Sequence, residues 1–315
     1  MDELYAPSEL YITIIGHLTQ PDIYSLANTS KPWNEFINSH SLLNQRISFK
    51  KVSSNLLSYI KDLIPRKKIC KMSFKTGNLE VLKWSRKVSR NTDIFYDKLY
   101  KYNILEAVKN GHLGIIKWAH KHGCCYWDSN VTSFAAEYGH LEILKWAYEN
   151  GCEIDLWYIC AFASRLGHLE ILKWAHENDC IDWGCDICSY AANGNHFEIL
   201  KWAREHGCAW DEKTFAIAAY NNNLEMLKWL RAHNCPWDKN ACINAANLDM
   251  LKWLRANNCP WNKRVLIRAL ARENLEMVRW AYENGCPFDD DVYNYFSEYS
   301  TNPEIIQWVC NTIRN

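Results

Sequence analysis

The sequence predicts an all-α protein, a solenoid of stacked helix pairs that follows a short N-terminal helical segment. Two observations lead to this prediction. The stretch GHLEILKWAYENGC, residues 139–152, returns as GHLEILKWAHENDC at residues 167–180. Within each copy the apolar residues have the spacing of an amphipathic helix. A short unit that repeats in this way buries its apolar face against its neighbours, which gives a solenoid.

A tryptophan that follows lysine or its substitute marks each copy. These residues are Trp84, Trp118, Trp146, Trp174, Trp202, Trp229, Trp253, Trp280 and Trp308. Consecutive tryptophans are 34, 28, 28, 28, 27, 24, 27 and 28 residues apart. We therefore expect about nine units over residues 66–315, preceded by a segment of different character.

Each unit is predicted to contain two short helices. In LEILKWAYEN, residues 141–150, Leu141, Leu144 and Ala147 lie on one side, with Ile143 beside them. VTSFAAEYGH, residues 131–140, predicts a helix that ends at Gly139, since glycine readily adopts the left-handed turn. Paired alanines recur before these turns and let two helices approach closely. The unit is thus helix, tight turn, helix and loop.

The run AAEYGHLEILKWAYENGC resembles the second half of an ankyrin repeat. The two alanines, the Gly-His turn, the apolar run and the final glycine with a small residue are in that family's register. The TPLH opening is missing, and the unit is shorter than the family's usual length of about 33 residues. The chain is similar to shortened ankyrin variants found in large DNA viruses and some microbial eukaryotes. This resemblance implies an α-solenoid of ankyrin-like helix pairs.

The repeated histidines occupy one turn position in successive units: His112, His140, His168 and His196. Packed helices lie about 8 to 10 Å apart, whereas zinc ligands lie about 2.0 to 2.3 Å from their ion, so these residues cannot share one metal. We predict that each imidazole bonds to backbone in its own turn. Asparagines at the equivalent place favour this interpretation: Asn223, Asn274 and Asn302.

The repeated cysteines are predicted to be small core residues. They are Cys124, Cys152, Cys180, Cys208, Cys235, Cys259 and Cys286. A zinc donor set of Cys180, Cys185, Cys188 and His196 is the alternative, but its CxxC has no second pair. We expect no metal and no cofactor. The repeated tryptophans are also predicted to fill the core.

The repeated lysines are predicted to form a solvated face. They are Lys83, Lys117, Lys145, Lys173, Lys201, Lys228 and Lys252. Most have an acid three residues earlier, namely Glu80, Glu142, Glu170, Glu198, Glu225 and Asp249. Such pairs neutralise the lysines and stabilise a helix by only about 0.2 to 0.5 kcal/mol each.

Composition excludes several classes of function. The 36 basic residues balance the 36 acidic ones, so no overall field favours nucleic acid or a membrane surface. No apolar run approaches the roughly 18 residues of a spanning helix, and MDELYAPSEL has no signal-peptide pattern. We find no phosphate loop, nucleophile elbow or carboxylate pair outside the repeat, hence no catalytic residue and no enzyme. We expect a soluble intracellular monomer with reduced thiols and a protein as partner.

Recognition is predicted where the units differ, at the leading positions of their first helices. The candidate target-binding residues are Asn130, Asp186, Lys213, Lys239, Asn240, Lys263 and Arg264. Varied side chains on a constant frame are how a solenoid encodes recognition. A basic drift toward the C-terminal units favours an acidic surface on an unidentified target protein.

The N-terminal segment, residues 1–40, is predicted to hold three short helices with an apolar pattern at Leu10, Ile14, Ile15 and Leu18. It resembles an F-box. By this resemblance, the residues that dock the Skp adaptor of a cullin-RING ubiquitin ligase would be Pro7, Leu10, Ile14, Leu18 and Leu26. Ala6, Asn28 and Thr29 depart from the family's apolar positions, which weakens the inferred affinity more than the fold.

The two resemblances together imply a substrate receptor of a Skp-cullin-F-box ligase. A scaffold whose first helices only cap the solenoid is the alternative. Residues 41–65 would form a helical linker that leads to the solenoid at 66–315. The expected compartment is the cytoplasm, that of the host if the chain is viral. The basic run PRKKICK at residues 65–71 leaves the nucleus as the alternative.

Overall fold

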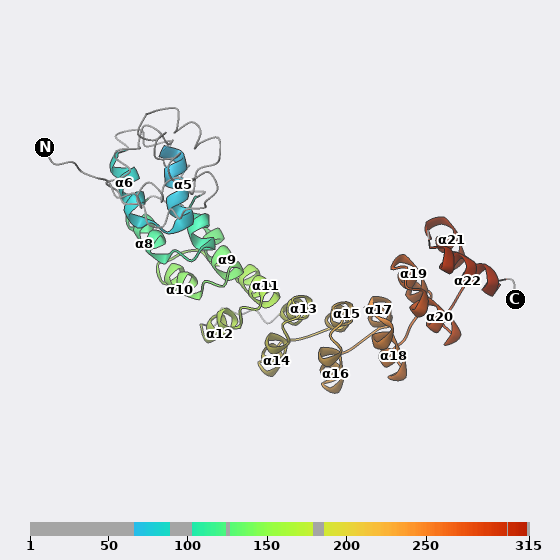
Figure 1. The fold of residues 1–315 in the computed structure, drawn as a ribbon. Helices are drawn as coiled ribbons and strands as arrows, with labels where there is room; N and C mark the ends of the chain where they lie inside the picture. The colour runs from blue at the N-terminus through green and yellow to red at the C-terminus, as the bar shows by residue number, and fades with distance from the viewer. Residues whose placement is uncertain (1–65, 89–102, 124–126, 179–185, 301, 314–315) are drawn as a thin grey trace, which may run out of the picture. The chain divides into compact units, whose positions relative to one another are not determined.

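A computed structural model describes residues 66–88, 103–123, 127–178, 186–300 and 302–313. Within these ranges all regular secondary structure is α-helical, and the helices occur in consecutive pairs (Figure 1). The predicted all-α solenoid is confirmed. The F-box-like segment at residues 1–40 and the linker at 41–65 lie outside the described residues and stay predictions. The chain divides into two compact halves, an N-terminal half, Met1–Asp155, and a C-terminal half, Leu156–Asn315.

In the N-terminal half the described helices form three pairs. They are α5 (Arg66–Thr76) with α6 (Leu79–Val88), residues 103–109 with α8 (Leu113–Lys121), and α9 (Ser129–Glu137) with α10 (Leu141–Glu149). The turn between α9 and α10 contains Gly139, whose φ is +76°. This left-handed conformation favours glycine and confirms the predicted end of the first helix.

In the C-terminal half six pairs follow one another. The first three are α11 (Leu156–Leu166) with α12 (Leu169–Glu177), α13 (Asp186–Asn193) with α14 (Phe197–Glu205), and α15 (Glu212–Tyr220) with α16 (Leu224–Ala232). The last three are α17 (Lys239–Asn244) with α18 (Leu248–Ala256), α19 (Arg264–Ala271) with α20 (Leu275–Glu283), and α21 (Asp290–Tyr299) with α22 (Pro303–Ile313).

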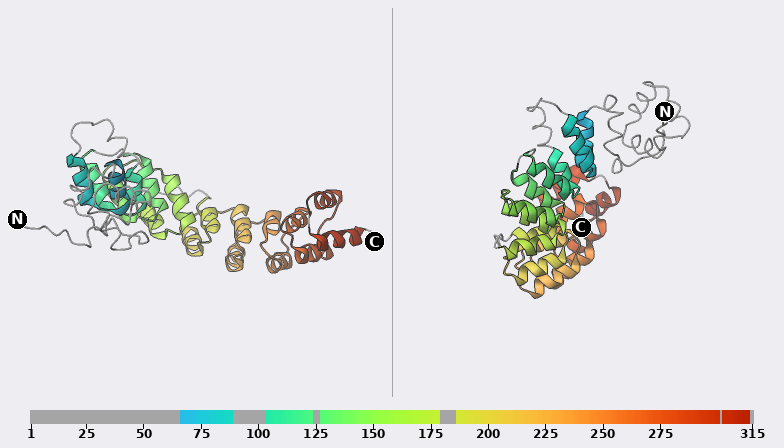
Figure 2. Two further views of the ribbon diagram at one scale, coloured as in Figure 1. Left: turned by 45° about the horizontal axis from the view of Figure 1, so that its top comes forward. Right: turned by 90° about the vertical axis from the view of Figure 1, so that its left-hand side faces the viewer.

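Within the C-terminal half the odd-numbered first helices form one row and the even-numbered second helices another (Figures 1 and 2). Each first helix packs on the next, from α11 through α13, α15, α17 and α19 to α21. The recurring tryptophans all lie on second helices. This is the stacking that the repeat predicts.

The core repeats with the sequence. On α10 the buried side chains are Ile143, Leu144 and Ala147, and the same positions are buried on α12 and α14. The predicted stripe is wrong in one residue, because Leu141 is only half-buried. Leu141 is the first residue of α10, next to the turn, whereas Ile143 faces the interior.

The described repeat cysteines are buried, as predicted: Cys152, Cys208, Cys235, Cys259 and Cys286. Four of them place their Sγ near a backbone carbonyl at the start of the first helix of their own unit; the Cys152 Sγ, for example, lies 3.3 Å from the Asp128 carbonyl oxygen. Burial raises the pKa of Cys152 to about 11 and that of Cys235 to about 12. These thiols therefore stay protonated at neutral pH and are poor nucleophiles. Cys124 and Cys180 lie outside the described residues.

The repeated tryptophans differ from the prediction, because eight of the nine are only half-buried and Trp174 alone is buried. Tryptophans of the loops pack on four of them, namely Trp146, Trp229, Trp253 and Trp280. Trp210 packs edge-to-face on Trp229, with 5.7 Å between ring centroids, and Trp127 packs in the same way on Trp146.

An arginine of the preceding second helix covers the other face of each loop tryptophan in three successive units. The guanidinium carbon of Arg204 lies 4.3 Å from the Trp210 ring centroid, and Arg231 and Arg255 repeat the contact on Trp237 and Trp261. We call this arrangement the Arg-Trp-Trp stack. It joins one unit to the next through cation-π and aromatic contacts.

Candidate protein-binding surface

Aspartates set the starts of several first helices. The Asp211 carboxylate accepts hydrogen bonds from the backbone N–H groups of Lys213 and Thr214, at 3.0 and 3.2 Å. Asp128 and Asp238 bond in the same way to the N–H groups of Asn130 and Asn240. Such caps satisfy backbone donors that the first turn of a helix leaves without partners. The side chains that follow each cap are thereby held at a defined position.

The predicted target-binding residues lie at these starts. Asn130 is exposed on α9 of the N-terminal half. In the C-terminal half Asp186 begins α13, Lys213 follows the first residue of α15, Lys239 and Asn240 begin α17, and Arg264 begins α19. All of these side chains are exposed, and Lys263, which precedes α19, is half-buried.

The starts of successive first helices in the C-terminal half are neighbours. Across α13 and α15, the Ser189 and Thr214 hydroxyl oxygens are 2.9 Å apart. Across α19 and α21, the Lys263 ammonium is 2.8 Å from Asp289 and also bonds to Asp291. We call the edge formed by Asp186, Lys213, Lys239, Asn240, Lys263 and Arg264 the first-helix edge.

The acidic start of α21 offsets part of the predicted basic drift. Hydrogen bonding to Asp289 and then to Asp291 raises the pKa of Lys263, and the same contact lowers the pKa of Asp289. Lys263 is thereby bound within the protein. By contrast, the side chains of Lys213, Lys239 and Arg264 form no ion pair within the described residues.

Exposed aromatic residues on the first helices are a feature that our sequence reasoning missed. Trp157 on α11 is 59% exposed and packs edge-to-face on Tyr190 of α13, with centroids 6.2 Å apart. Tyr220 at the end of α15 is 54% exposed. Exposed aromatics are common anchors of protein interfaces. Their place at the outer positions of first helices is the signal that would have found them.

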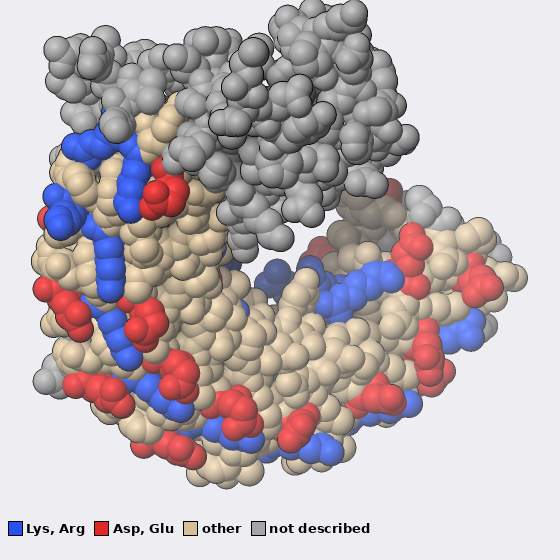
Figure 3. All heavy atoms as spheres, turned by 60° about the vertical axis from the view of Figure 1, so that its left-hand side comes forward, with Lys and Arg blue, Asp and Glu red and all other residues tan. Residues whose placement is uncertain are grey.

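The lysines of the second helices form the predicted solvated face. Ion pairs join Lys83 to Glu80, Lys145 to Glu142, Lys173 to Glu170 and Lys201 to Glu198, at 2.8, 3.9, 2.7 and 2.9 Å. The predicted pairs of Lys228 with Glu225 and of Lys252 with Asp249 are not within ion-pair distance. Basic and acidic side chains are interspersed on the face seen in Figure 3. This pattern does not form a continuous basic track.

For His112 and His140 the predicted bond to backbone is confirmed, but its partner was predicted wrongly. The Nε2 atom of His112 lies 3.0 Å from the Lys75 carbonyl oxygen, and that of His140 lies 2.9 Å from the Lys109 carbonyl oxygen. Both carbonyls belong to the preceding unit rather than to the histidine's own turn. The imidazole is long enough to cross between units. Asn223 at the equivalent place bonds in both directions. Its Oδ1 accepts from the Met226 N–H at 2.9 Å, and its Nδ2 donates to Asn195 Oδ1 of the preceding unit at 2.6 Å.

Glycine makes room for this histidine bridge, which gives a testable difference between two glycines. Gly111 has a φ of +74°, and a Cβ there would lie 2.9 Å from the His140 ring; Gly151 has a φ of +77° with open space around it. Alanine at either site costs about 1 to 2 kcal/mol of backbone strain. We expect Gly111→Ala to destabilise by about 1 kcal/mol more, because it also disturbs the His140 hydrogen bond. Denaturant unfolding measures this, and equal losses for the two variants would contradict the bridge.

Two of the four residues of the zinc alternative lie within the described residues. Cys188 is buried on α13, and His196 precedes α14. Cys180 and Cys185 lie outside the described residues. Within the described part of the chain, no group of three or more His, Cys, Asp or Glu side chains is arranged to hold a metal ion. No described helix is long and apolar enough to cross a membrane.

Comparison with known proteins adds a likeness of fold. No family model matches the chain, and no curated protein sequence matches it. Among solved structures, the crystal structure of the human ASB11 ankyrin repeat domain is similar over 62% of this chain and 99% of that domain. The two are 16% identical in sequence, with a TM-score of 0.48. We assign no partner or activity from this likeness.

Proposed function

We propose that this protein is a non-catalytic receptor that holds a target protein on the first-helix edge. The observation that supports this proposal is the arrangement of that edge. Capped helix starts present different exposed side chains on successive copies of one frame. Repetition of a constant core with a varied surface is how solenoids distinguish partners.

The charge of the edge supports an acidic target surface. Lys213, Lys239 and Arg264 are exposed and have no ion-pair partner within the described residues. Charged groups of this kind contribute mainly to the rate of association and to the choice of partner. A target with carboxylates in matching positions would bind faster, and the effect would weaken with salt.

Reversing these three charges tests the edge. We expect the triple variant Lys213→Glu, Lys239→Glu and Arg264→Glu to reduce recovery of the target at least about tenfold, because attraction becomes repulsion at three positions. Lys263 is left unchanged because it binds Asp289 and Asp291. The measurement is quantitative mass spectrometry of proteins recovered with wild-type and variant chains.

A matched control has the same change in charge on the second helices. Lys228→Glu, Lys252→Glu and Arg279→Glu replace exposed cations that form no ion pair within the described residues. This variant should recover the target as wild type does. Equal losses in both triple variants would mean that only net charge matters, and unchanged recovery in the first variant would move the target to another surface.

We further propose that residues 1–40 recruit a Skp adaptor, which would make the protein a substrate receptor of a Skp-cullin-F-box ubiquitin ligase. This step rests on the F-box resemblance and on residues outside the described part of the chain. Co-purification of the full chain with a Skp adaptor tests it. Failure to recover the adaptor would leave a binding scaffold with no role in ubiquitin ligation.

A further inference from the structure

The unit with the 24-residue spacing has lost part of its first helix and its turn. Aligning its WDKNACINAANL with WDEKTFAIAAYNNNL of the preceding unit shows that the equivalent of Tyr220, Asn221 and Asn222 is missing. Accordingly, α17 has 6 residues where α15 has 9. The chain passes directly from Ala245 and Ala246 into the cap of α18 at Asn247. The stack therefore lacks one helix end between α15 and α19.

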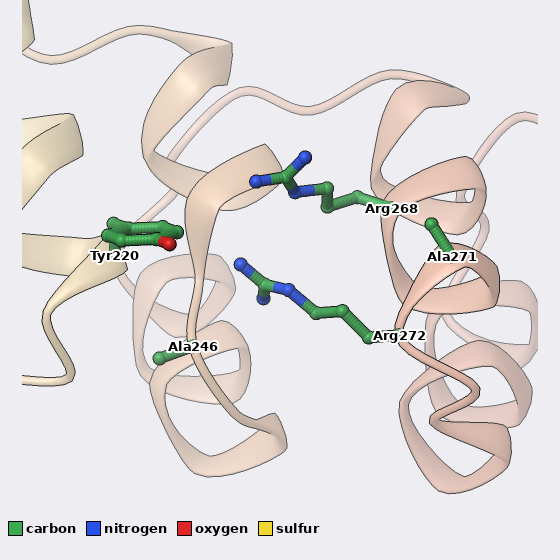
Figure 4. Close-up of a pocket in the computed structure, with 5 residues that line it drawn as sticks. All are labelled: Tyr220, Ala246, Arg268, Ala271 and Arg272. Carbon is green, nitrogen blue, oxygen red and sulfur yellow. The ribbon is translucent and has the colours of Figure 1, made fainter.

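A hollow of ≈ 360 Å³ lies where that helix end is missing. Tyr220 of α15 lines one side and Ala246 the middle. The other side is lined by Arg268 and Ala271 of α19 and by Arg272, which follows that helix. Figure 4 shows both guanidinium groups extending from α19 toward the Tyr220 ring. The volume is at the lower end of known ligand pockets, so it suits one side chain or a small anion.

The two arginines have different roles. Arg272 donates from Nη1 to the Ala245 carbonyl oxygen at 2.5 Å, and its guanidinium carbon lies 6.0 Å from the Tyr220 ring centroid. It thus closes the end of the shortened helix. Arg268 is exposed, and its guanidinium forms no hydrogen bond or ion pair within the described residues. Partial burial, together with Arg268, lowers the pKa of Arg272.

We propose that this hollow receives an oxyanion carried by a side chain of the target protein. Two guanidinium groups converge there, and no carboxylate lines the hollow. Guanidinium presents paired N–H donors that match the oxygens of a carboxylate or a phosphate. The Tyr220 ring provides apolar area beside them. The anion would offset the mutual repulsion of the two arginines, which gives binding energy that a neutral side chain lacks.

This inference rests on the proposed function, because it adds a specificity pocket to the target-binding solenoid. Two sources of the oxyanion fit, the carboxylate of glutamate or aspartate and the phosphate of a phosphorylated residue. Arg268 has the free donors, so it is the residue whose removal should matter most. Arg279 on α20 is also an exposed cation without an ion pair among the described residues, and it lies outside both the lining and the first-helix edge, which makes it a matched control.

The test uses the full chain and three fluorescent peptide pools with the same randomised neutral flanks. The central residue is glutamate, phosphoserine or glutamine. We expect at least one anionic pool to bind about tenfold or more tightly than the glutamine pool, as charge-assisted hydrogen bonds imply. Arg268→Gln should abolish this preference, Arg268→Lys should retain part of it, and Arg279→Gln should change it less than about twofold. Fluorescence anisotropy reports binding, and thermal melting checks that each variant is folded.

The outcomes separate clearly. Tighter binding of the phosphoserine pool assigns a phosphate, and tighter binding of the glutamate pool assigns a carboxylate. Equal binding of all pools, absence of binding by both anionic pools, or equal losses in Arg268→Gln and Arg279→Gln overturns the pocket. If Arg268 governs the preference while the triple charge reversal leaves target recovery intact, the proposed first-helix edge fails and the pocket stands.

Discussion

The double variant Leu10→Asp and Leu18→Asp is expected to lose a Skp adaptor completely in a pulldown, while the melting transition of the repeats stays that of wild type. By the F-box resemblance both leucines contact the adaptor, so aspartate would bury unpaired charge at that contact. Burying an isolated charge costs several kcal/mol or more, enough to break an interface. The solenoid should be insensitive, because its units are stabilised by their neighbours.

A matched control places the same two charges at polar positions of the same segment. Thr13→Asp with Ser25→Asp should keep the adaptor, since neither residue belongs to the F-box positions that the resemblance assigns to the contact. If wild type never captures an adaptor and the leucine variant lowers the melting temperature of the repeats, the N-terminal segment is a cap of the solenoid. The scaffold alternative would then hold.

The second large effect is expected from Trp237→Ala, which should destabilise the C-terminal half by about 2 to 4 kcal/mol. Three contacts would be lost together. The Trp237 ring lies under Arg231 at 4.3 Å, and its centroid is 5.1 Å from that of Phe215 and 6.5 Å from that of Trp253. Its partners belong to two successive units. Their coupling should weaken, so the unfolding transition should also broaden.

Two control variants separate the effect of the tryptophan ring itself from the effect of its position in the stack. Arg231→Gln removes the cation but keeps the ring, and it should cost only about 0.5 to 1 kcal/mol. Trp157→Ala makes the same substitution at a tryptophan that is 59% exposed, and it should change stability by less than about 1 kcal/mol. Denaturant unfolding followed by circular dichroism measures all three. Equal losses at Trp157 and Trp237 would contradict the Arg-Trp-Trp stack as the link between units.

Much of the candidate surface could be predicted from the sequence, for a physical reason. The starts of first helices are set by local chemistry, because an aspartate such as Asp211 caps the helix that follows it. The first two positions after this cap, Glu212 and Lys213, precede the apolar stripe of the helix, and both are exposed. What those positions bind cannot be predicted in this way, because it depends on which charges remain unpaired across units. Lys263 shows this, since its partners Asp289 and Asp291 belong to the next unit.

By itself, the sequence determined the helix pairs, their order and most residues of the buried faces, because these depend on apolar periodicity and turn residues within one unit. It did not show that most of the recurring tryptophans are only half-buried. Only the tertiary structure decided the contacts between units. It placed the His140 imidazole on the carbonyl of Lys109, the Arg204 guanidinium over Trp210, and Arg268 and Arg272 around the hollow beside Tyr220. Each contact joins residues of different units through long side chains. Their reach depends on how the units stack, which local periodicity does not specify.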